Sequence, residues 1–590
     1  MNSTIERLQK KLQLSPHDPE LHYELGRSYL ALRQADAAEQ AFKQALHWAP
    51  DHPQILMQLG NVASQKGNET VAAEYFRQSL KQDAQQADVH FNFANSLRKL
   101  GENATAIQHY LASLRLAPHD AECHNNLGNA YREQGQLDLA VASYAQAMQL
   151  DPQLLHAKVH WIHQKQHMAD WQGLDVAIAE VRQALRSNTQ ARIPPFAFLA
   201  MPGTTDKEQL ACASLWAQQH YGHIQPLPPP ASKAAHQRIR LAYISSDFRR
   251  HPLAYLVTDV IAAHDRRQFE VTLYSNAKDD QSPERQAFVT AADQWVDITH
   301  MTDAEVAVHM RHAGIDILID LTGYTQHSRC GVTAYRPARK HINWLGYPGS
   351  MGFLHGRPLF DAIVIDETLK SATLAEQPVL LPCYQPNNAR RPEADAGTRA
   401  QHGLPEQGFV FCCLNQSFKI TPDIFASWMH ILEQAPGSVL WLLQSNGWAT
   451  RNLQQQAQAA GIQVDRLIFA PRMHIDQHIA RQQHADLMLD TSPYNAHTTA
   501  SDALWQGIPI LTVAGDTFPA RVSASLLHRV GLPQCICEDW KALEQRAIDL
   551  ARDSAALAEL KTTLKNQAQV LFEPEIFCRQ LEQSLVQLLS

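Results

Sequence analysis

The chain of 590 residues is predicted to contain an α-helical repeat superhelix followed by two α/β domains, each with a doubly wound parallel sheet. Two observations predict this order. A 34-residue pattern occurs four times in the first quarter of the sequence, and apolar runs alternate with helical stretches from Arg238 and again from Phe409. Repeated helix pairs stack into a superhelix with a concave surface. Alternating βα units produce parallel sheets.

Small and aromatic residues at fixed positions define the repeat. The first copy contains Leu25-Gly26, Ala38 and Phe42, and steps of 34 residues give the other copies. Small side chains are expected where the two helices of a pair approach closely. The spacing and residue choice resemble the tetratricopeptide repeat, a helix–turn–helix unit. The small residues that recur in the first helix are Gly26, Gly60, Ala94 and Gly128.

The α/β region is predicted from runs of apolar residues that are short enough to be strands. Three runs belong to the first α/β domain and five to the second. Prolines and a change of period mark the connecting segments. The predicted strands are 239–244, 269–274 and 315–320, then 409–413, 439–443, 467–469, 487–490 and 508–512.

These patterns divide the chain into six segments. The repeats are preceded by a capping helix, and two segments are expected to connect domains. The segments are a capping helix at 1–16, four repeats at 17–152, an atypical capping unit and linker at 153–236, the first α/β domain at 237–384, a linker at 385–406 and the second α/β domain at 407–590.

Composition narrows the classes of function. The net charge of −8 offers no basic face for a phosphate backbone, so nucleic acid is not an expected partner. No apolar run is long enough for a membrane helix, and the N-terminus lacks a signal-like apolar region, so we expect no membrane partner and a cytoplasmic location. The nine scattered cysteines contain no zinc-like pair of pairs and indicate small buried residues.

One loop in the second domain has the pattern of a phosphate site. An apolar strand ends at Asp490, and a helix is expected to start at Thr498 and Thr499, just after His497. Free backbone N–H groups at a helix N-terminus bind phosphate. A plain threonine cap explains the same local pattern.

Three further side chains follow strands in the same way. Lys419 comes after the first strand of the second domain, next to Gln416, and is placed to neutralise a diphosphate. His478 follows a strand and has a ring that can stack on a base. His251 follows a strand of the first domain and can accept a proton near neutral pH. Each has a structural alternative: a solvated lysine, a histidine in a helix start, and a hydrogen-bonded core histidine.

The motifs together resemble the protein O-linked N-acetylglucosamine (O-GlcNAc) transferase family, which has the GT-B architecture of two Rossmann-like lobes. The resemblance covers nearly the whole chain and includes the repeats. The matching motifs are Ser245-Ser-Asp-Phe-x-x-His251-Pro, Leu321-Thr-Gly-Tyr-Thr325, Trp344-Leu-Gly-Tyr-Pro-Gly349, Asn415-Gln416-x-x-Lys419, His497-Thr-Thr-x-x-Asp502 and Gly515-Asp-Thr-x-x-x-Arg521.

The resemblance implies a role for each matching residue. His251 would line the sugar and acceptor site and is a candidate base, although the base of this family is disputed. Lys419 would act in catalysis on the diphosphate. The residues implied to bind the nucleotide sugar are Gln416, Lys419, Met473, Ile475, His478, Arg481, His497, Thr498, Thr499 and Asp502.

The implied reaction is inverting transfer of GlcNAc from UDP-GlcNAc to Ser or Thr hydroxyls of proteins. No Asp-x-Asp pattern occurs, so we expect no metal and no cofactor. Two departures from the animal members are visible. A lysine of those members is replaced by Ile475, and their long insertion between the lobes is reduced to about 20 residues, 385–406.

Other functions remain open from the sequence. A related branch uses GDP-fucose for protein O-fucosylation, but generally lacks the His and Asp found here at His497 and Asp502. No motif in the sequence distinguishes UDP-glucose from UDP-GlcNAc as the donor. A non-catalytic repeat scaffold is the alternative of another class, and the matching residues of the lobes argue against it.

The concave side of the repeats is the expected site for a protein acceptor. The position before each Leu-Gly pair or its equivalent holds Glu24, Gln58, Asn92 and Asn126. An asparagine amide can bond both the N–H and the C=O of an extended peptide. The sequence therefore predicts peptide capture by Asn92 and Asn126, with an ordinary hydrated groove as the alternative.

Overall fold

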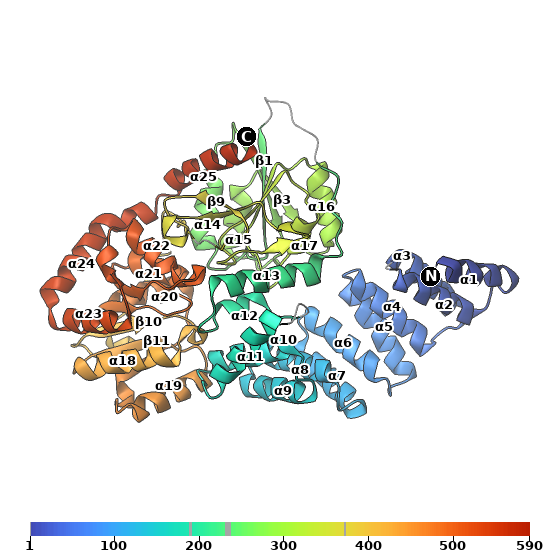
Figure 1. Ribbon diagram of the computed structural model, residues 1–590, viewed down its shortest axis with the longest axis horizontal. Helices are drawn as coiled ribbons and strands as arrows, with labels where there is room; N and C mark the ends of the chain where they lie inside the picture. The colour runs from blue at the N-terminus through green and yellow to red at the C-terminus, as the bar shows by residue number, and fades with distance from the viewer. Residues whose placement is uncertain (1, 33, 188–190, 230–237, 371–372) are drawn as a thin grey trace. The chain divides into compact units, whose positions relative to one another are not determined.

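The computed structural model describes residues 2–32, 34–187, 191–229, 238–370 and 373–590 (Figure 1). The chain consists of two compact units, with the main division after Gln164. The first unit holds the repeats, and the second holds both parallel sheets. The domain boundary expected at residues 236–237 lies outside the described residues.

The first unit begins with helix α1, Asn2–Leu14, and continues as four helix pairs. The expected close approach is confirmed in the pairs that contain a glycine. A Cβ atom added to Gly26 would lie 2.6 Å from the ring of Phe42, and one on Gly60 would lie 2.5 Å from Phe76. The paired helices are α2 Pro19–Ala31, α3 Ala35–Trp48, α4 Pro53–Gln65, α5 Glu69–Gln82, α6 Ala87–Lys99, α7 Asn103–Leu116, α8 Ala121–Glu133 and α9 Leu137–Leu150.

Four more helices precede the first sheet. Two of them belong to the capping unit expected after the repeats, and two lie in 193–236, where the prolines had predicted only a connection. Pro195 fits the first turn of a helix, because its missing N–H would have no intrahelical partner there. Thr205 and Glu208 form a capping box that starts the last helix. The helices are α10 Leu155–His167, α11 Leu174–Ser187, α12 Pro195–Leu199 and α13 Asp206–Tyr221.

The first lobe contains a seven-stranded sheet in the order β3-β2-β1-β4-β5-β8-β9, and every pairing in it is parallel. Four of its strands, each of four residues, were not predicted from the sequence. Its strands are β1 Ile239–Ser245, β2 Phe269–Ser275, β3 Gln294–Asp297, β4 Ile317–Asp320, β5 Lys340–Asn343, β8 Ala362–Ile365 and β9 Gln377–Leu380; its helices are α14 Ala254–Ala262, α15 Pro283–Ala291, α16 Asp303–His312 and α17 Cys330–Ala334. A separate hairpin pairs β6 Phe353–Leu354 with β7 Arg357–Pro358.

The second lobe has a six-stranded parallel sheet in the order β12-β11-β10-β13-β14-β15. All five predicted strand regions are found in it. The strands are β10 Val410–Cys413, β11 Val439–Leu443, β12 Leu467–Ala470, β13 Leu487–Leu489, β14 Ile510–Val513 and β15 Ile536–Cys537. The helices are α18 Pro422–Gln434, α19 Gly447–Ala459, α20 Ile475–Ala480, α21 Thr498–Trp505, α22 Val522–Arg529, α23 Trp540–Arg552 and α24 Ser554–Gln567.

The last helix, α25 Pro574–Leu589, follows the second lobe in sequence but packs on the first. It contacts α14 (Figure 1). Leu581, Leu585 and Leu588 join the apolar core of the first lobe. Helix α25 therefore connects the second lobe to the first.

Short 3-10 helices complete the second unit, and residues 385–406 contain one of them. No helix among the described residues is long and apolar enough to cross a membrane. The predicted class, a helical repeat array followed by two parallel α/β lobes, is confirmed. The 3-10 helices are η1 Glu367–Leu369, η2 Ala400–His402, η3 Ser417–Lys419, η4 Val464–Arg466, η5 Arg481–His484, η6 Phe518–Ala520, η7 Pro533–Cys535 and η8 Ala568–Leu571.

Candidate functional site

The strand order of each lobe has a switch point, where successive connections leave the sheet in opposite directions. In the second lobe the chain proceeds from β10 to β11 on one side and later from β13 to β14 on the other. In the first lobe the same switch occurs between β1 and β4. Ligands of open parallel sheets bind at such a switch point, beyond the carboxyl ends of the strands.

Lys419 lies at the switch point of the second lobe. It ends the 3-10 turn that follows β10, and its Nζ donates a hydrogen bond of 2.7 Å to the backbone oxygen of Asn495, in the loop after β13. The same ammonium lies 4.2 Å from the ring centroid of Tyr494. Two loops far apart in sequence thus meet around one cation.

The surroundings of Lys419 make its ammonium group lose a proton more easily than an exposed lysine does. Burial lowers the pKa of this lysine to about 8, although the nearby Asp490 carboxylate acts in the opposite direction. Asp490 is itself buried and accepts bonds from the backbone N–H groups of Thr491 and Ala496 and from the Thr512 hydroxyl. Lys419 is therefore a cation that a bound anion would stabilise further.

The helix expected at the threonines is confirmed as α21, which begins at Thr498. His497 occupies the capping position, and neither threonine acts as the cap. The half-buried Thr498 and Thr499 supply the first N–H groups of the helix. A helix N-terminus of this kind carries partial positive charge and attracts an anion.

The ring of His497 is held neutral. Burial keeps its pKa well below the usual value, and the Lys419 ammonium acts in the same direction. Nε2 lies 3.2 Å from the backbone oxygen of Pro519, which can only accept, so the proton of the neutral ring is on Nε2. The ring also stacks on Tyr494, with the centroids 4.8 Å apart.

His478 and Arg481 form a pair at α20, after β12. The Arg481 guanidinium donates to His478 Nδ1 at 2.7 Å and to the Pro471 carbonyl at 2.8 Å. Burial, with Arg481 beside it, lowers the pKa of His478 to about 4, so the ring is neutral. Arg481 is fully buried. The resemblance implied that Arg481 contacts the nucleotide; in the structure this buried side chain bonds to His478, and the contact with a nucleotide stays a prediction.

The other predicted residues of this edge are half-buried. Met473 and Ile475 lie in the loop and first turn between β12 and α20. Gln416 Oε1 accepts a hydrogen bond of 3.3 Å from Arg472, which links the loop after β10 to the loop after β12. The ends of β10, β12 and β13 thus supply all the predicted groups of the second lobe.

Asp502 has a partner that the sequence did not reveal. Its Oδ1 lies 3.0 Å from Nε of Arg391, and both side chains are buried. Arg391 also donates to the Tyr255 carbonyl and to Asn387 Oδ1. Arg391 therefore joins the linker, α14 of the first lobe and α21 of the second lobe.

His251 follows β1 at the switch point of the first lobe. Burial lowers its pKa below the ordinary value, although Asp247 acts in the opposite direction. The backbone N–H of Leu253 donates to Nδ1 at 3.3 Å, so the neutral ring carries its proton on Nε2, which lies 3.8 Å from Asp247 Oδ1. Acceptance of a proton at Nε2 requires the other tautomer.

The repeats carry a separate polar groove within the first unit. It has a volume of about 580 Å³, and Asn92 and Asn126 line it as predicted. Each is bonded to a second asparagine: Asn92 Nδ2 donates to Asn61 Oδ1 at 3.0 Å, and Asn126 Nδ2 donates to Asn95 Oδ1 at 3.1 Å. The groove therefore has two columns of amides, of which the sequence analysis named one.

A sequence profile described as "Glycosyl transferase family 41" matches residues 215–388 and 390–581, which include both sheets and every candidate residue of the lobes. The chain belongs to glycosyl transferase family 41. Tetratricopeptide-repeat profiles match residues 2–61, 53–86 and 83–153, so the repeat prediction is confirmed.

Several relatives of the chain have names that describe a sugar transfer. The chain is 30% identical over 451 residues to a probable UDP-N-acetylglucosamine–peptide N-acetylglucosaminyltransferase SEC of Arabidopsis thaliana, covering 72% of the chain and 46% of the relative. It is 30% identical over 350 residues to the SPINDLY protein of Hordeum vulgare, which has the same printed activity, covering 56% and 36%. The chain spans less than half the length of these curated relatives.

A solved structure supports the same architecture. An O-GlcNAc transferase mutant of Thermobaculum terrenum superposes with a TM-score of 0.67 and 25% identity, covering 91% of this chain and 97% of that one. The repeat array followed by a GT-B pair of lobes is therefore shared between them.

Proposed function

We propose that this family 41 chain transfers GlcNAc from UDP-GlcNAc to Ser and Thr hydroxyls of proteins, with inversion and without a metal ion. The observation that supports this most strongly is the meeting of the Lys419 ammonium with the loop that leads into α21. Cationic and N–H donors at one switch point suit a nucleoside diphosphate that leaves with negative charge.

The chemical step is a single displacement. The acceptor hydroxyl oxygen forms a bond to the anomeric carbon, the bond from that carbon to the diphosphate oxygen breaks, and UDP leaves with the electron pair. Lys419 and the backbone N–H groups of Thr498 and Thr499 stabilise the departing charge. Each preorganised donor of this type contributes about 3–4 kcal/mol to the barrier reduction.

The hydroxyl proton must pass to a base. His251 is our candidate, because its pKa lies below the ordinary value and the ring is neutral at pH 7. The bond from Leu253 to Nδ1 means that His251 must change tautomer before Nε2 can take the proton. The neutral His478 ring is suited to stack on uracil, and Asp502 to accept from the ribose.

A donor panel tests this function. The chain is incubated with an acceptor protein mixture and equal amounts of labelled UDP-GlcNAc, UDP-glucose or GDP-fucose, with EDTA or with added Mn²⁺. We expect UDP-GlcNAc to give the highest kcat/KM, unchanged initial rates in EDTA and no stimulation by Mn²⁺. A preference for GDP-fucose or a requirement for Mn²⁺ would contradict the proposal.

The pH dependence of kcat/KM for the donor should follow the protonation of Lys419. Because its pKa in the free protein is about 8, we expect kcat/KM for the donor to fall as pH rises through about 8, where the ammonium loses its proton. The bound diphosphate favours the charged form, so kcat should fall at a higher pH than kcat/KM. Lys419→Arg, which stays charged, should remove this decline; an identical profile would show that another group causes it.

Substitutions in the asparagine groove should weaken the binding of protein acceptors without changing the use of the donor. We expect Asn92→Ala combined with Asn126→Ala to raise KM for protein acceptors roughly 5–150-fold, since each lost hydrogen bond to a peptide contributes about 0.5–1.5 kcal/mol. Hydrolysis of UDP-GlcNAc without acceptor should not change. Gln82→Ala, at an exposed position outside the groove, is the matched control. Unchanged labelling of proteins by the double variant would exclude acceptor binding there.

A further inference from the structure

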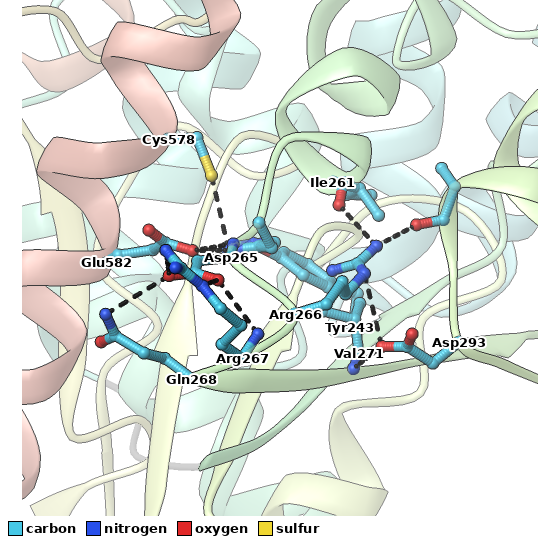
Figure 2. Close-up of polar contacts among 12 residues, drawn as sticks. Tyr243, Ile261, Asp265, Arg266, Arg267, Gln268, Val271, Asp293, Cys578 and Glu582 are labelled. Atoms are coloured by element: carbon cyan, nitrogen blue, oxygen red, sulfur yellow. Dashed lines mark hydrogen bonds and ion pairs between the residues drawn. The ribbon is translucent and has the colours of Figure 1, made fainter. Parts of the chain in front are cut away.

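Three groups that commonly bind metals converge in the first lobe, away from the donor site. Figure 2 shows Cys578 and Glu582 projecting from one helix toward the same region. Cys578 Sγ lies 3.4 Å and Glu582 Oε1 lies 3.0 Å from the same atom, Nδ1 of His264. All three potential ligand atoms lie within 4.8 Å of one another.

The fold explains why these groups meet. Cys578 and Glu582 are four residues apart on α25, so their side chains share one face of the helix. His264 comes just after α14, the helix on which α25 packs. Since α14 connects two parallel strands, it ends at the amino-terminal edge of the sheet. The cluster therefore lies at the edge opposite the switch point.

Hydrogen bonds alone satisfy this cluster poorly. A neutral imidazole nitrogen either donates one bond or accepts one. With a proton on Nδ1 the ring donates to the Glu582 carboxylate, and the Cys578 sulfur can accept only weakly from the same N–H group. With the proton on Nε2 the thiol can donate to Nδ1, but the carboxylate then faces a lone pair. One cation bound by all three groups removes this conflict.

The His264 ring and the Glu582 carboxylate have supporting hydrogen bonds of the kind that metal ligands have. Nε2 of His264 lies 2.8 Å from the Tyr243 hydroxyl, and the ring is fully buried. If Nε2–H donates to Tyr243, the Nδ1 lone pair points toward the other two groups. Glu582 Oε1 also accepts from the backbone N–H of Asp265 at 2.8 Å. Metal-bound histidines and carboxylates have such supporting hydrogen bonds.

We propose that His264, Cys578 and Glu582 bind a zinc ion, with water as the fourth ligand. Tetrahedral zinc with bonds of about 2.0–2.3 Å separates its ligand atoms by about 3.3–3.6 Å, close to the 3.0 and 3.4 Å found here. A thiolate and a carboxylate balance the ion's two charges in a buried site. A soft thiolate with imidazole disfavours Mg²⁺ and Ca²⁺.

Binding must release a proton from the cysteine. Burial raises the pKa of the Cys578 thiol, so it is protonated without the ion, and the proton leaves to solvent as the zinc–sulfur bond forms. Arg266 lies near the site, but its guanidinium is bonded to the Ile261 and Ala291 carbonyls and lies 3.5 Å from Asp293 (Figure 2). Two other nearby cations are also paired: Arg267 lies 3.0 Å from Asp265, and Arg579 lies 3.9 Å from Glu575.

The ion would have a structural role. It would join the last helix of the chain to the first lobe, adding to the packing of Leu581 and Leu585. It lies at the opposite edge of the sheet from the donor site, so zinc binding and the proposed sugar transfer can fail separately.

Titration of the full chain, without an affinity tag, tests the proposal. Co²⁺ is added to chelator-treated protein, and we expect one equivalent to give a thiolate-to-cobalt charge-transfer band that Zn²⁺ abolishes. Zinc should also raise the Tm by about 2–4 °C. No thiolate band and no zinc-dependent Tm with the unmodified chain would overturn the proposal without any variant.

Variants separate this site from the other histidines and cysteines of the chain. Cys578→Ser and Glu582→Gln should each weaken zinc binding at least 10-fold, and Cys578→Ser should abolish the charge-transfer band. Tyr243→Phe, which removes only the supporting hydroxyl, should weaken binding about 10–100-fold. Cys537→Ser, at the half-buried cysteine of β15, is the control and should bind as the parent does. Equal binding by Cys578→Ser and the parent would place the ion elsewhere.

Discussion

Lys419→Ala is expected to lower kcat by about 10²–10³-fold, the largest effect of any single polar substitution in the second lobe. The ammonium connects the loop after β10 to the loop after β13 and faces the site where the diphosphate would leave. Its charge is needed most as the bond to the sugar breaks. Initial rates with saturating UDP-GlcNAc and a fixed acceptor measure the effect.

Two comparisons make the result specific. Lys565→Ala, at an exposed position on the last turn of α24, should retain full activity. Circular dichroism and Tm should show that Lys419→Ala is folded, because its side chain makes one hydrogen bond to a backbone oxygen. Activity of Lys419→Ala equal to that of the parent would remove Lys419 from the mechanism.

Arg391→Ala is expected to destabilise the protein by about 3–5 kcal/mol, because it leaves Asp502 as a buried carboxylate without its cation. The loss should be largest near neutral pH. In the variant, burial raises the pKa of Asp502 above its unfolded value, so the deficit grows as pH rises from about 4 and shrinks in acid, where the carboxyl is protonated. Urea unfolding at several pH values measures it.

The control for this pair is an ion pair on the surface. Arg579→Ala removes a contact of 3.9 Å to Glu575, where both side chains are exposed, and should change stability by less than about 0.5 kcal/mol. Arg391→Met combined with Asp502→Asn should recover part of the loss, since no uncompensated charge remains. If Arg391→Ala unfolds at the same urea concentration as Arg579→Ala, the buried pair does not connect the lobes.

The periodic parts of the molecule could be predicted from the sequence. The 34-residue step predicted the helix pairs. The apolar runs of the second lobe predicted five strand regions, and the structure has a strand in each of them. Strands such as β3 Gln294–Asp297 and β5 Lys340–Asn343 were missed, because four residues with polar side chains carry no distinct period. Asn61 and Asn95 were also missed, although the same 34-residue step relates them and could have found them.

Contacts that depend on the tertiary fold could not be predicted. Arg391 lies in a segment with little regular structure, so nothing in its local sequence indicates a partner 111 residues away. Two further contacts could not be predicted for the same reason. They are the contact of the Lys419 ammonium with the Tyr494 ring and the hydrogen bond from Leu253 that sets the His251 tautomer. The bond between Arg481 and His478 is another contact that the sequence did not reveal.

The central claim is that this chain transfers N-acetylglucosamine to proteins. Mass spectrometry of a cell lysate incubated with the purified chain and UDP-GlcNAc tests it most directly, with Lys419→Ala as the matched inactive protein. We predict N-acetylhexosamine on Ser and Thr residues of many proteins with the parent chain and none above background with Lys419→Ala. No added sugar on any protein, in a sample where the parent chain binds UDP, would contradict the claim and indicate a non-catalytic repeat scaffold.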